Sequence, residues 1–429
     1  MPALKWSCSA SHKKIFQVHC FQLVAMGRSL QDKIAEMHVI DTHEHTYPYE
    51  VISGRDLSIV DILEGSYVFW ATSVPKRDDY EALAKNLKRI SGSTFYKSCS
   101  IAMREIYGID IDPPKAESLA KASKLVHDAY LNKDWIRKVF KEKALIDKAL
   151  LDPYWNFWGG SFDTELFSPV FRINMLLFGY SRDAKDHNGN SPYVLEKYFN
   201  MKVGSFEDYI ELIDKSLEEA KRRNYVAIKS ALAYDRSILF QEVDASEAKH
   251  IFEKSGSGLT DREIRLFGDF VLNRIISKAG ELELPVQFHT GLALIEGSSP
   301  MNLVNILRKY SNVNFVFFHG GYPWIRETAA LAFSFPNLYL DLCWLPIISP
   351  SACKIMLREI IELGLSSRTM WGGDCWVAEA TYGALKLFKN ILAEVLQDMI
   401  SDRYLKPDEA LGIASGILRE NAARFFNLL

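Results

Sequence analysis

Two histidines separated by one residue give the strongest chemical signal in the sequence. His43 and His45 stand in the segment Ile40-Asp41-Thr42-His43-Glu44-His45, directly after a short apolar run. On a β-strand, residues two apart point to the same side, so both imidazoles would face one space. Two imidazoles on one face supply half of the ligands of a typical metal site. Taken alone, the pair is explained equally well by structural histidines in the core or in solvent.

Polar residues follow three later apolar runs in the same way. The residues are His289 after Leu284–Phe288, His319 after Val313–Phe318, and Asp374 after Thr369–Trp371. A glycine lies within two residues of each of them and permits close backbone approach. If the runs are strands of a parallel barrel, all of these positions open onto the same rim. The recurrence therefore favours a metal site over unrelated structural positions.

Short apolar runs alternate with helical stretches along the chain, which is typical of an α/β protein with a parallel sheet. Eight runs can be counted, at Met37–Asp41, Ala144–Leu151, Val170–Phe178, Tyr225–Ala231, Leu284–Phe288, Val313–Phe318, Leu338–Leu342 and Thr369–Trp371. Most are apolar at nearly every position, as in strands that are buried on both faces. Eight such units predict a (β/α)8 TIM barrel.

About 100 residues separate the first two runs, far more than a usual connection. Within them Asp78–Ile90, Ser98–Tyr107 and Pro114–Tyr130 have helical spacing. We therefore expect a helical cap inserted after the first strand, at about residues 46–143, on the C-terminal rim of the barrel. The predicted organisation is an N-terminal extension and lead-in at residues 1–36, followed by the barrel with its cap at residues 37–429.

Composition excludes several classes of protein. The 429 residues are 48% hydrophobic, with 51 basic and 54 acidic side chains and no long block of one sign, so nucleic acid is not expected as a partner. No apolar stretch approaches the roughly 18 residues of a membrane span. Six cysteines without a CxxC pair are typical of a reduced, cytoplasmic protein. We expect a small-molecule substrate; the sequence leaves open a homo-oligomer.

From about Met37 to Leu428 the chain resembles the amidohydrolase superfamily. The closest likeness is to the amidohydrolase-related subgroup (amidohydrolase 2), in the branch fused to glutamine-synthetase-like domains in nodulin-type proteins. The residues that carry it are Ile228-Lys229-Ser230 with Tyr234 and Arg236, Phe288-His289-Thr290-Gly291, His319-Gly320-Gly321-Tyr322-Pro323, Glu379-Ala380-Thr381-Tyr382, and the segment Arg419–Phe426. Two departures are Gly373 before Asp374, where Ser or Thr is common, and Asp235 between Tyr234 and Arg236.

The resemblance implies a ligand set of His43, His45, His289 and Asp374 for a divalent metal, with His319 as a catalytic residue beside it. A metal with an open position lowers the pKa of bound water towards ~7. Asp374 would also be catalytic, accepting the water's proton and delivering it to the leaving group. His319 would polarise a carbonyl or stabilise an oxyanion. Zinc is expected, with manganese as the alternative, and one or two ions.

Four residues are expected to contact substrate: Lys229, Arg172, Arg236 and Tyr234. Lys229 could bind a substrate carboxylate, carry a carboxyl group that bridges two metals, or be a plain solvated lysine. Arg172 lies in an apolar run and needs a partner, which could be a substrate carboxylate or a structural acid.

The implied function is a metal-dependent hydrolase that cleaves an amide, C–N or ester bond in a small, carboxylate-bearing substrate. The same scaffold hosts other reactions, so two rivals stay open. One is a metal-dependent decarboxylase or a uronate-isomerase-like enzyme. The other is a non-catalytic metal-binding protein.

Overall fold

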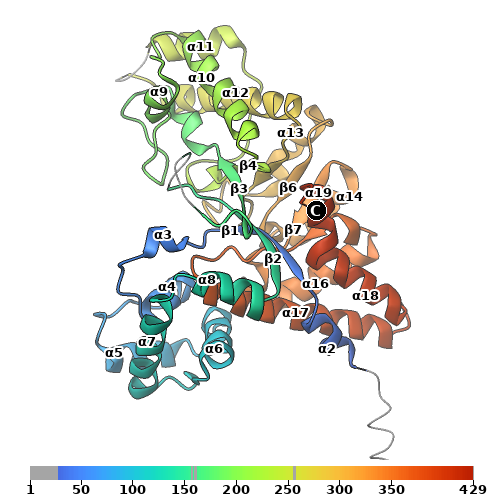
Figure 1. Ribbon diagram of the computed structural model, residues 1–429. Helices are drawn as coiled ribbons and strands as arrows, with labels where there is room; N and C mark the ends of the chain where they lie inside the picture. Colours follow the sequence, from blue (N-terminus) through green and yellow to red (C-terminus); the bar gives the residue numbers. More distant parts are fainter. Residues whose placement is uncertain (1–27, 156–157, 159–161, 255–257, 429) are drawn as a thin grey trace, which may run out of the picture.

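An eight-stranded parallel barrel lies at the centre of the protein (Figure 1). The computed structural model describes residues 28–428, except 156–157, 159–161 and 255–257. The strands are β1 (Val39–Glu44), β2 (Ile146–Leu151), β3 (Phe167–Arg172), β4 (Ala227–Ser230), β5 (Val286–Phe288), β6 (Phe315–Phe317), β7 (Leu338–Asp341) and β8 (Thr369–Met370). Each pairs with the next in chain order. The Thr42 N–H donates to the Trp371 carbonyl at 3.2 Å and joins the first strand to the last. The predicted TIM barrel is confirmed.

The third predicted run was placed too late in the sequence. The strand is Phe167–Arg172, and Asn174–Phe178 forms a 3-10 helix. The chain turns there because the Asn174 side chain accepts a hydrogen bond from the Ala231 N–H (2.8 Å) and donates one to Asp235 (2.7 Å). The apolar residues after Asn174 are therefore buried in a short helix, which periodicity alone does not distinguish from a buried strand.

The long segment between β1 and β2 is helical, as predicted. It contains α3 (Tyr49–Ile52), α4 (Ile59–Gly65), η1 (Val68–Trp70), α5 (Tyr80–Arg89), α6 (Thr94–Tyr107), α7 (Ala116–Tyr130), α8 (Trp135–Lys138) and the π-helical turn η2 (Val139–Lys143). We call this segment the cap. Two of its helices begin at side-chain caps: the Ser58 side chain accepts the Val60 N–H at 3.2 Å at the start of α4, and the Asp79 side chain accepts the Ala82 N–H at 2.9 Å at the start of α5. Figure 1 shows the cap as a separate group of helices beside the strands.

The remaining α-helices and the π-helical turn η8 surround the barrel (Figure 1). They are α2 (Leu30–Ala35), α9 (Val194–Phe199), α10 (Phe206–Arg222), α11 (Ala245–Lys254), α12 (Asp261–Glu281), α13 (Val304–Lys309), α14 (Ile325–Ser334), α15 (Leu345–Ile348), α16 (Pro350–Glu362), α17 (Ala378–Ser401), α18 (Pro407–Ser415), η8 (Gly416–Glu420) and α19 (Asn421–Phe425). In the described part of the chain, no helix combines the length and the apolar character that crossing a membrane requires. Residues 1–27 of the predicted extension lie outside the described residues.

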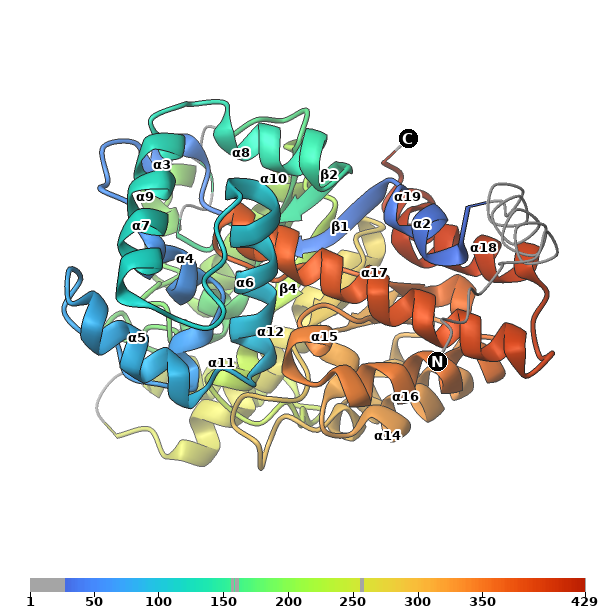
Figure 2. The same ribbon diagram turned by 90° about the horizontal axis from the view of Figure 1, so that it is seen from below.

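Helix α17 joins the cap to the barrel. It extends from the cap along one side of the barrel, and α6 packs across its N-terminal part (Figure 2). A side chain at Gly383 would bring a Cβ within 2.2 Å of the Ser98 carbonyl oxygen of α6, so the two helices can approach this closely only with glycine at that position. Near its middle α17 packs against α2, and the Lys389 side chain donates to the carbonyls of Ala35 (3.0 Å) and Met37 (2.6 Å).

Candidate metal centre

The barrel brings the predicted site residues together at the C-terminal ends of its strands. A cavity of about 180 Å³ opens there. Its lining includes seven predicted residues: His43, His45, Arg172, Lys229, Tyr234, His289 and Asp374. His319 is fully buried directly behind them. Tyr67 and Trp70 of the cap also line the cavity, so the cap lies over this rim.

His43 and His45 both approach the carboxylate of Asp374. The Nε2 atoms of both histidines lie 3.4 Å from Oδ1 of Asp374. Two ligand atoms that are each about 2.0–2.1 Å from a tetrahedral zinc ion lie about 3.3–3.4 Å from one another. The donor atoms are therefore spaced as ligands of one divalent ion would be, and the residues fit the predicted metal.

Backbone contacts hold these donors in place. The Asp374 N–H donates to the His43 carbonyl at 2.7 Å, and the Tyr67 hydroxyl donates to the Asp374 carbonyl at 2.5 Å. Nδ1 of His45 faces the Asp152 carbonyl at 3.3 Å; a proton there leaves the Nε2 lone pair free for a metal. Asp374 and His319 both have positive φ angles, 55° and 64°, a conformation that costs non-glycine residues about 1–3 kcal/mol and is concentrated at functional sites.

Burial sets the protonation of the site. It lowers the pKa of His43, His289 and His319 well below the ordinary value, and lowers that of His45 less strongly. Burial also raises the pKa of Asp374, an effect that the neighbouring His45 and Lys229 charges oppose. The imidazoles are therefore neutral near pH 7, which is the form that binds metals.

His289 and His319 contact one another, and together they face more hydrogen-bond partners than two neutral imidazoles have N–H protons to supply. Nε2 of His319 lies 2.9 Å from Nδ1 of His289, while Nε2 of His289 faces the Leu292 carbonyl (2.9 Å) and Nδ1 of His319 faces that of Cys343 (3.0 Å). Three hydrogen bonds need three protons, and two neutral imidazoles carry two. Nδ1 of His319 is also 3.7 Å from Oδ2 of Asp374. His289 thus joins the cluster through His319, and its role as a metal ligand stays a prediction.

Lys229, the last residue but one of β4, lines the cavity. Its ammonium nitrogen lies 3.4 Å from Nε2 of His43 and 3.3 Å from the centre of the Phe318 ring. Burial lowers the pKa of Lys229 to about 8. Lys229 is buried, so the expectation of a plain solvated lysine was wrong. The amine lines the cavity, and its roles in binding a substrate or bridging two metals stay predictions.

Arg172 is paired with a buried acid. Its guanidinium donates to Oδ2 of Asp152 from Nε (3.0 Å) and from Nη2 (2.6 Å), and it stacks 4.8 Å from the centre of the Tyr154 ring. Although burial opposes it, the charge of Arg172 lowers the pKa of Asp152. Nη1 of Arg172 donates to Oδ1 of Asn188 at 2.9 Å, and both residues line the cavity. Asp152 and Asn188 thus hold the guanidinium at the cavity wall, and its contact with substrate stays a prediction.

Tyr234 faces the cavity, whereas Arg236 contacts helix α12. The Tyr234 ring lies 4.5 Å from that of His289, in the cavity lining. The Arg236 guanidinium donates to Asp269 (2.6 Å) and to the Arg265 carbonyl (2.9 Å), both in α12. These contacts favour a structural role for Arg236, and its contact with substrate stays a prediction.

Sequence reasoning missed two residues near the centre. Asp152 groups with His43 and His45, and Cys343 groups with His319 and Asp374, each set having ligand atoms within 4.8 Å of one another. Asp152 follows the second apolar run and Cys343 follows the seventh, so each carries the same signal that marked His289 and His319.

Comparisons with known proteins agree with this arrangement. The model of the amidohydrolase family matches residues 252–428, which contain His289, His319 and Asp374. Protein fluG of Emericella nidulans is 27% identical over 222 residues, which cover 47% of this chain and 26% of fluG. The chain thus spans about a quarter of the length of that relative.

Solved structures share the fold over almost the whole chain. A uronate isomerase from Thermotoga maritima has a TM-score of 0.75 at 16% identity, covering 92% of this chain and 96% of its own. A protein of Lactobacillus casei, for which metal-dependent hydrolase activity has been suggested, has a TM-score of 0.68 at 19% identity, covering 93% and 98%. A glucuronate isomerase from Caulobacter crescentus has a TM-score of 0.71 at 15% identity, covering 93% of both chains. At these identities the likeness establishes the fold.

Proposed function

We propose that this protein is a metal-dependent hydrolase of the amidohydrolase superfamily, in the amidohydrolase-related subgroup and its nodulin-type branch. The observation that carries the proposal is the convergence of His43 and His45 on Asp374, with both Nε2 atoms 3.4 Å from one carboxylate oxygen. The family match over residues 252–428 supports it. The reaction is attack of water on an amide, C–N or ester bond of a small substrate.

His43, His45 and Asp374 would hold the ion, with His289 as the fourth ligand. Zinc is proposed first and manganese second; such an ion lowers the pKa of water towards ~7. The Asp374 carboxylate takes the proton of the attacking water and passes it to the leaving group. His319, 3.7 Å from the same carboxylate, stabilises the negative charge that develops on the carbonyl oxygen.

Two cations in the cavity suit a substrate that carries a carboxylate. Lys229 offers its ammonium group, and Arg172 offers Nη1, which donates to Asn188 of the cavity lining and does not contact Asp152. Tyr234 adds a hydroxyl and an aromatic face. At about 180 Å³ the cavity accommodates a small reacting group and leaves little room for bulk solvent.

Elemental analysis of the purified protein tests the metal. We expect about one equivalent of zinc or manganese, retained in the control variant Arg262→Gln, whose side chain is exposed on α12, and lost in His45→Ala. Two equivalents would assign Lys229 as a carboxylated bridge. Absence of metal after chelator-free preparation would overturn the metal-dependent hydrolase proposal.

Turnover in isotopically labelled water distinguishes the reactions. Incorporation of labelled oxygen into the product of an amide, ester or lactone, lost in Asp374→Asn, is the expected result. Release of carbon dioxide without incorporation would identify a decarboxylase, and isomerisation without incorporation would identify an isomerase; either result would overturn the hydrolase proposal.

A further inference from the structure

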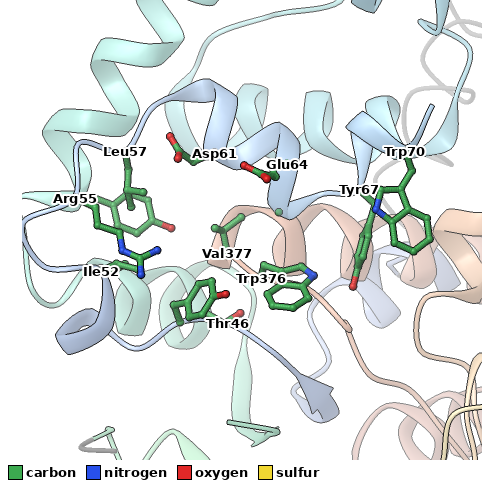
Figure 3. Close-up of a pocket in the computed structure, with 13 residues that line it drawn as sticks. Thr46, Ile52, Arg55, Leu57, Asp61, Glu64, Tyr67, Trp70, Trp376 and Val377 are labelled. Carbon is green, nitrogen blue, oxygen red and sulfur yellow. The ribbon is translucent and has the colours of Figure 1, made fainter. Parts of the chain in front are cut away.

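A second, larger cavity adjoins the metal centre. Its volume is about 400 Å³, against about 180 Å³ for the cavity at the metal centre. Cap residues form most of its lining, and Trp376 and Val377 close it from the barrel side (Figure 3). We call it the outer cavity. It falls within the size range of small-molecule binding sites.

Three aromatic side chains line both cavities. They are Tyr67, Trp70 and Trp376. Trp376 stacks on the candidate ligand His45, with ring centres 4.9 Å apart. Trp70 is 63% exposed, so little packing fixes the outermost part of this wall. Only the side chains of these three aromatic residues therefore separate a ligand in the outer cavity from the metal centre.

The outer cavity also carries one cation and one anion that lack ion-pair partners among the described residues. Arg55 stacks on Tyr47, with its guanidinium carbon 5.5 Å from the ring centre, and Glu64 lies above Val377 and Trp376 (Figure 3). The other acid in the lining, Asp61, is already paired with Arg77. Figure 3 places Arg55 and Trp70 at opposite ends of the cavity, with Val377 and Trp376 between them.

We infer that the outer cavity is a second substrate subsite, which binds an amino-acid-like end group. A carboxylate binds Arg55, because guanidinium and carboxylate form paired, charge-assisted hydrogen bonds. An amino group binds Glu64, and an apolar or aromatic portion stacks on Trp376. The bond to be cleaved lies beyond the aromatic wall, at the metal centre. Only this last point rests on the proposed function; binding of the end group does not require turnover.

Quenching of tryptophan fluorescence tests the subsite, since Trp70 and Trp376 line it. The probes are phenylalanine, phenylalaninamide (no carboxylate) and 3-phenylpropionate (no amino group). We expect phenylalanine to bind most tightly. Arg55→Gln should weaken phenylalanine about tenfold and leave phenylalaninamide within about twofold, while Glu64→Gln should weaken phenylalaninamide and spare 3-phenylpropionate. Both side chains are exposed, so the variants fold, which their unfolding midpoints verify.

Two controls separate this inference from the proposed function. Arg262→Gln, remote on α12, should bind phenylalanine like the wild type, and so should Asp374→Asn, which disables only the metal centre. Equal affinity for all three probes, unchanged binding in Arg55→Gln, or no binding at millimolar phenylalanine would each overturn the subsite. If phenylalanine binding depends on Arg55 but the purified protein holds no metal, the subsite proposal stands and the metal-dependent hydrolase proposal is wrong.

Discussion

The Tyr130 hydroxyl donates to the Glu379 carboxylate at 2.7 Å and so connects cap helix α7 to the first turn of α17. Tyr107 (2.5 Å) and Trp135 (2.8 Å) donate to the same carboxylate from α6 and α8. Glu379 is completely buried, so these three donors supply the hydrogen bonds that water would give an exposed carboxylate. Because α17 begins a few residues after Asp374, the carboxylate fixes the cap relative to the metal centre.

We predict that Tyr130→Phe lowers the free energy of unfolding by about 1–2 kcal/mol, because one hydrogen bond to a buried charge is lost. Glu379→Ala should cost more, about 3 kcal/mol or above, since it leaves three donors without an acceptor. Urea unfolding measures both. Glu117→Ala, at an exposed position of α7, is the matched control and should stay within about 0.5 kcal/mol of wild type. Equal losses in Glu379→Ala and Glu117→Ala would show that the carboxylate does not hold the cap.

Metal binding should stabilise the folded protein. With free zinc at about a thousandfold its dissociation constant, linkage adds about 4 kcal/mol to the free energy of unfolding. Thermal unfolding of chelator-treated protein, with and without zinc, measures this. The gain should vanish in His43→Ala, whose Nε2 is one of the two nitrogens that face Asp374. A zinc-dependent shift of equal size in that variant would place the ion elsewhere.

Breaking the buried pair of Arg172 and Asp152 should be costly. Arg172→Met leaves an uncompensated carboxylate in the barrel and should cost about 3–5 kcal/mol in urea unfolding. Adding Asp152→Asn removes that charge, so the double variant should recover much of the loss. If the double variant is less stable than Arg172→Met alone, the pair is not the source of the effect.

Lys389 should make stability depend on pH. Burial, and secondarily the charge of Lys386, lower the pKa of Lys389 to about 7 from its ordinary 10.5. Between these values the unfolded chain binds more protons than the folded one, so the free energy of unfolding rises with pH. We predict that wild type gains stability relative to Lys389→Met between about pH 7.5 and pH 9.5, by urea unfolding. A difference that stays constant or shrinks over this range would contradict the prediction.

The pattern of apolar and polar residues along the sequence was enough to predict the barrel and to locate the candidate metal ligands in the chain. An apolar run and the polar residue that follows it are adjacent in the sequence, so both can be recognised without the structure. Parallel strands then bring their C-terminal ends to one rim of the barrel. His43, His45, His289 and Asp374 therefore reach one cavity, as expected. The error in the third run arose because the turn at Asn174 depends on Ala231 and Asp235, which lie far along the chain.

Tertiary structure alone decided which side chains are partners. The pairing of Arg172 with Asp152, of Arg236 with Asp269 and of His289 with His319 depends on rotamers and on distances between separate elements. The outer cavity likewise exists only because the cap folds over the rim beside Trp376. Sequence periodicity fixes the direction of a side chain from its own strand or helix, whereas its partner is set by the packing of segments that are distant in the chain.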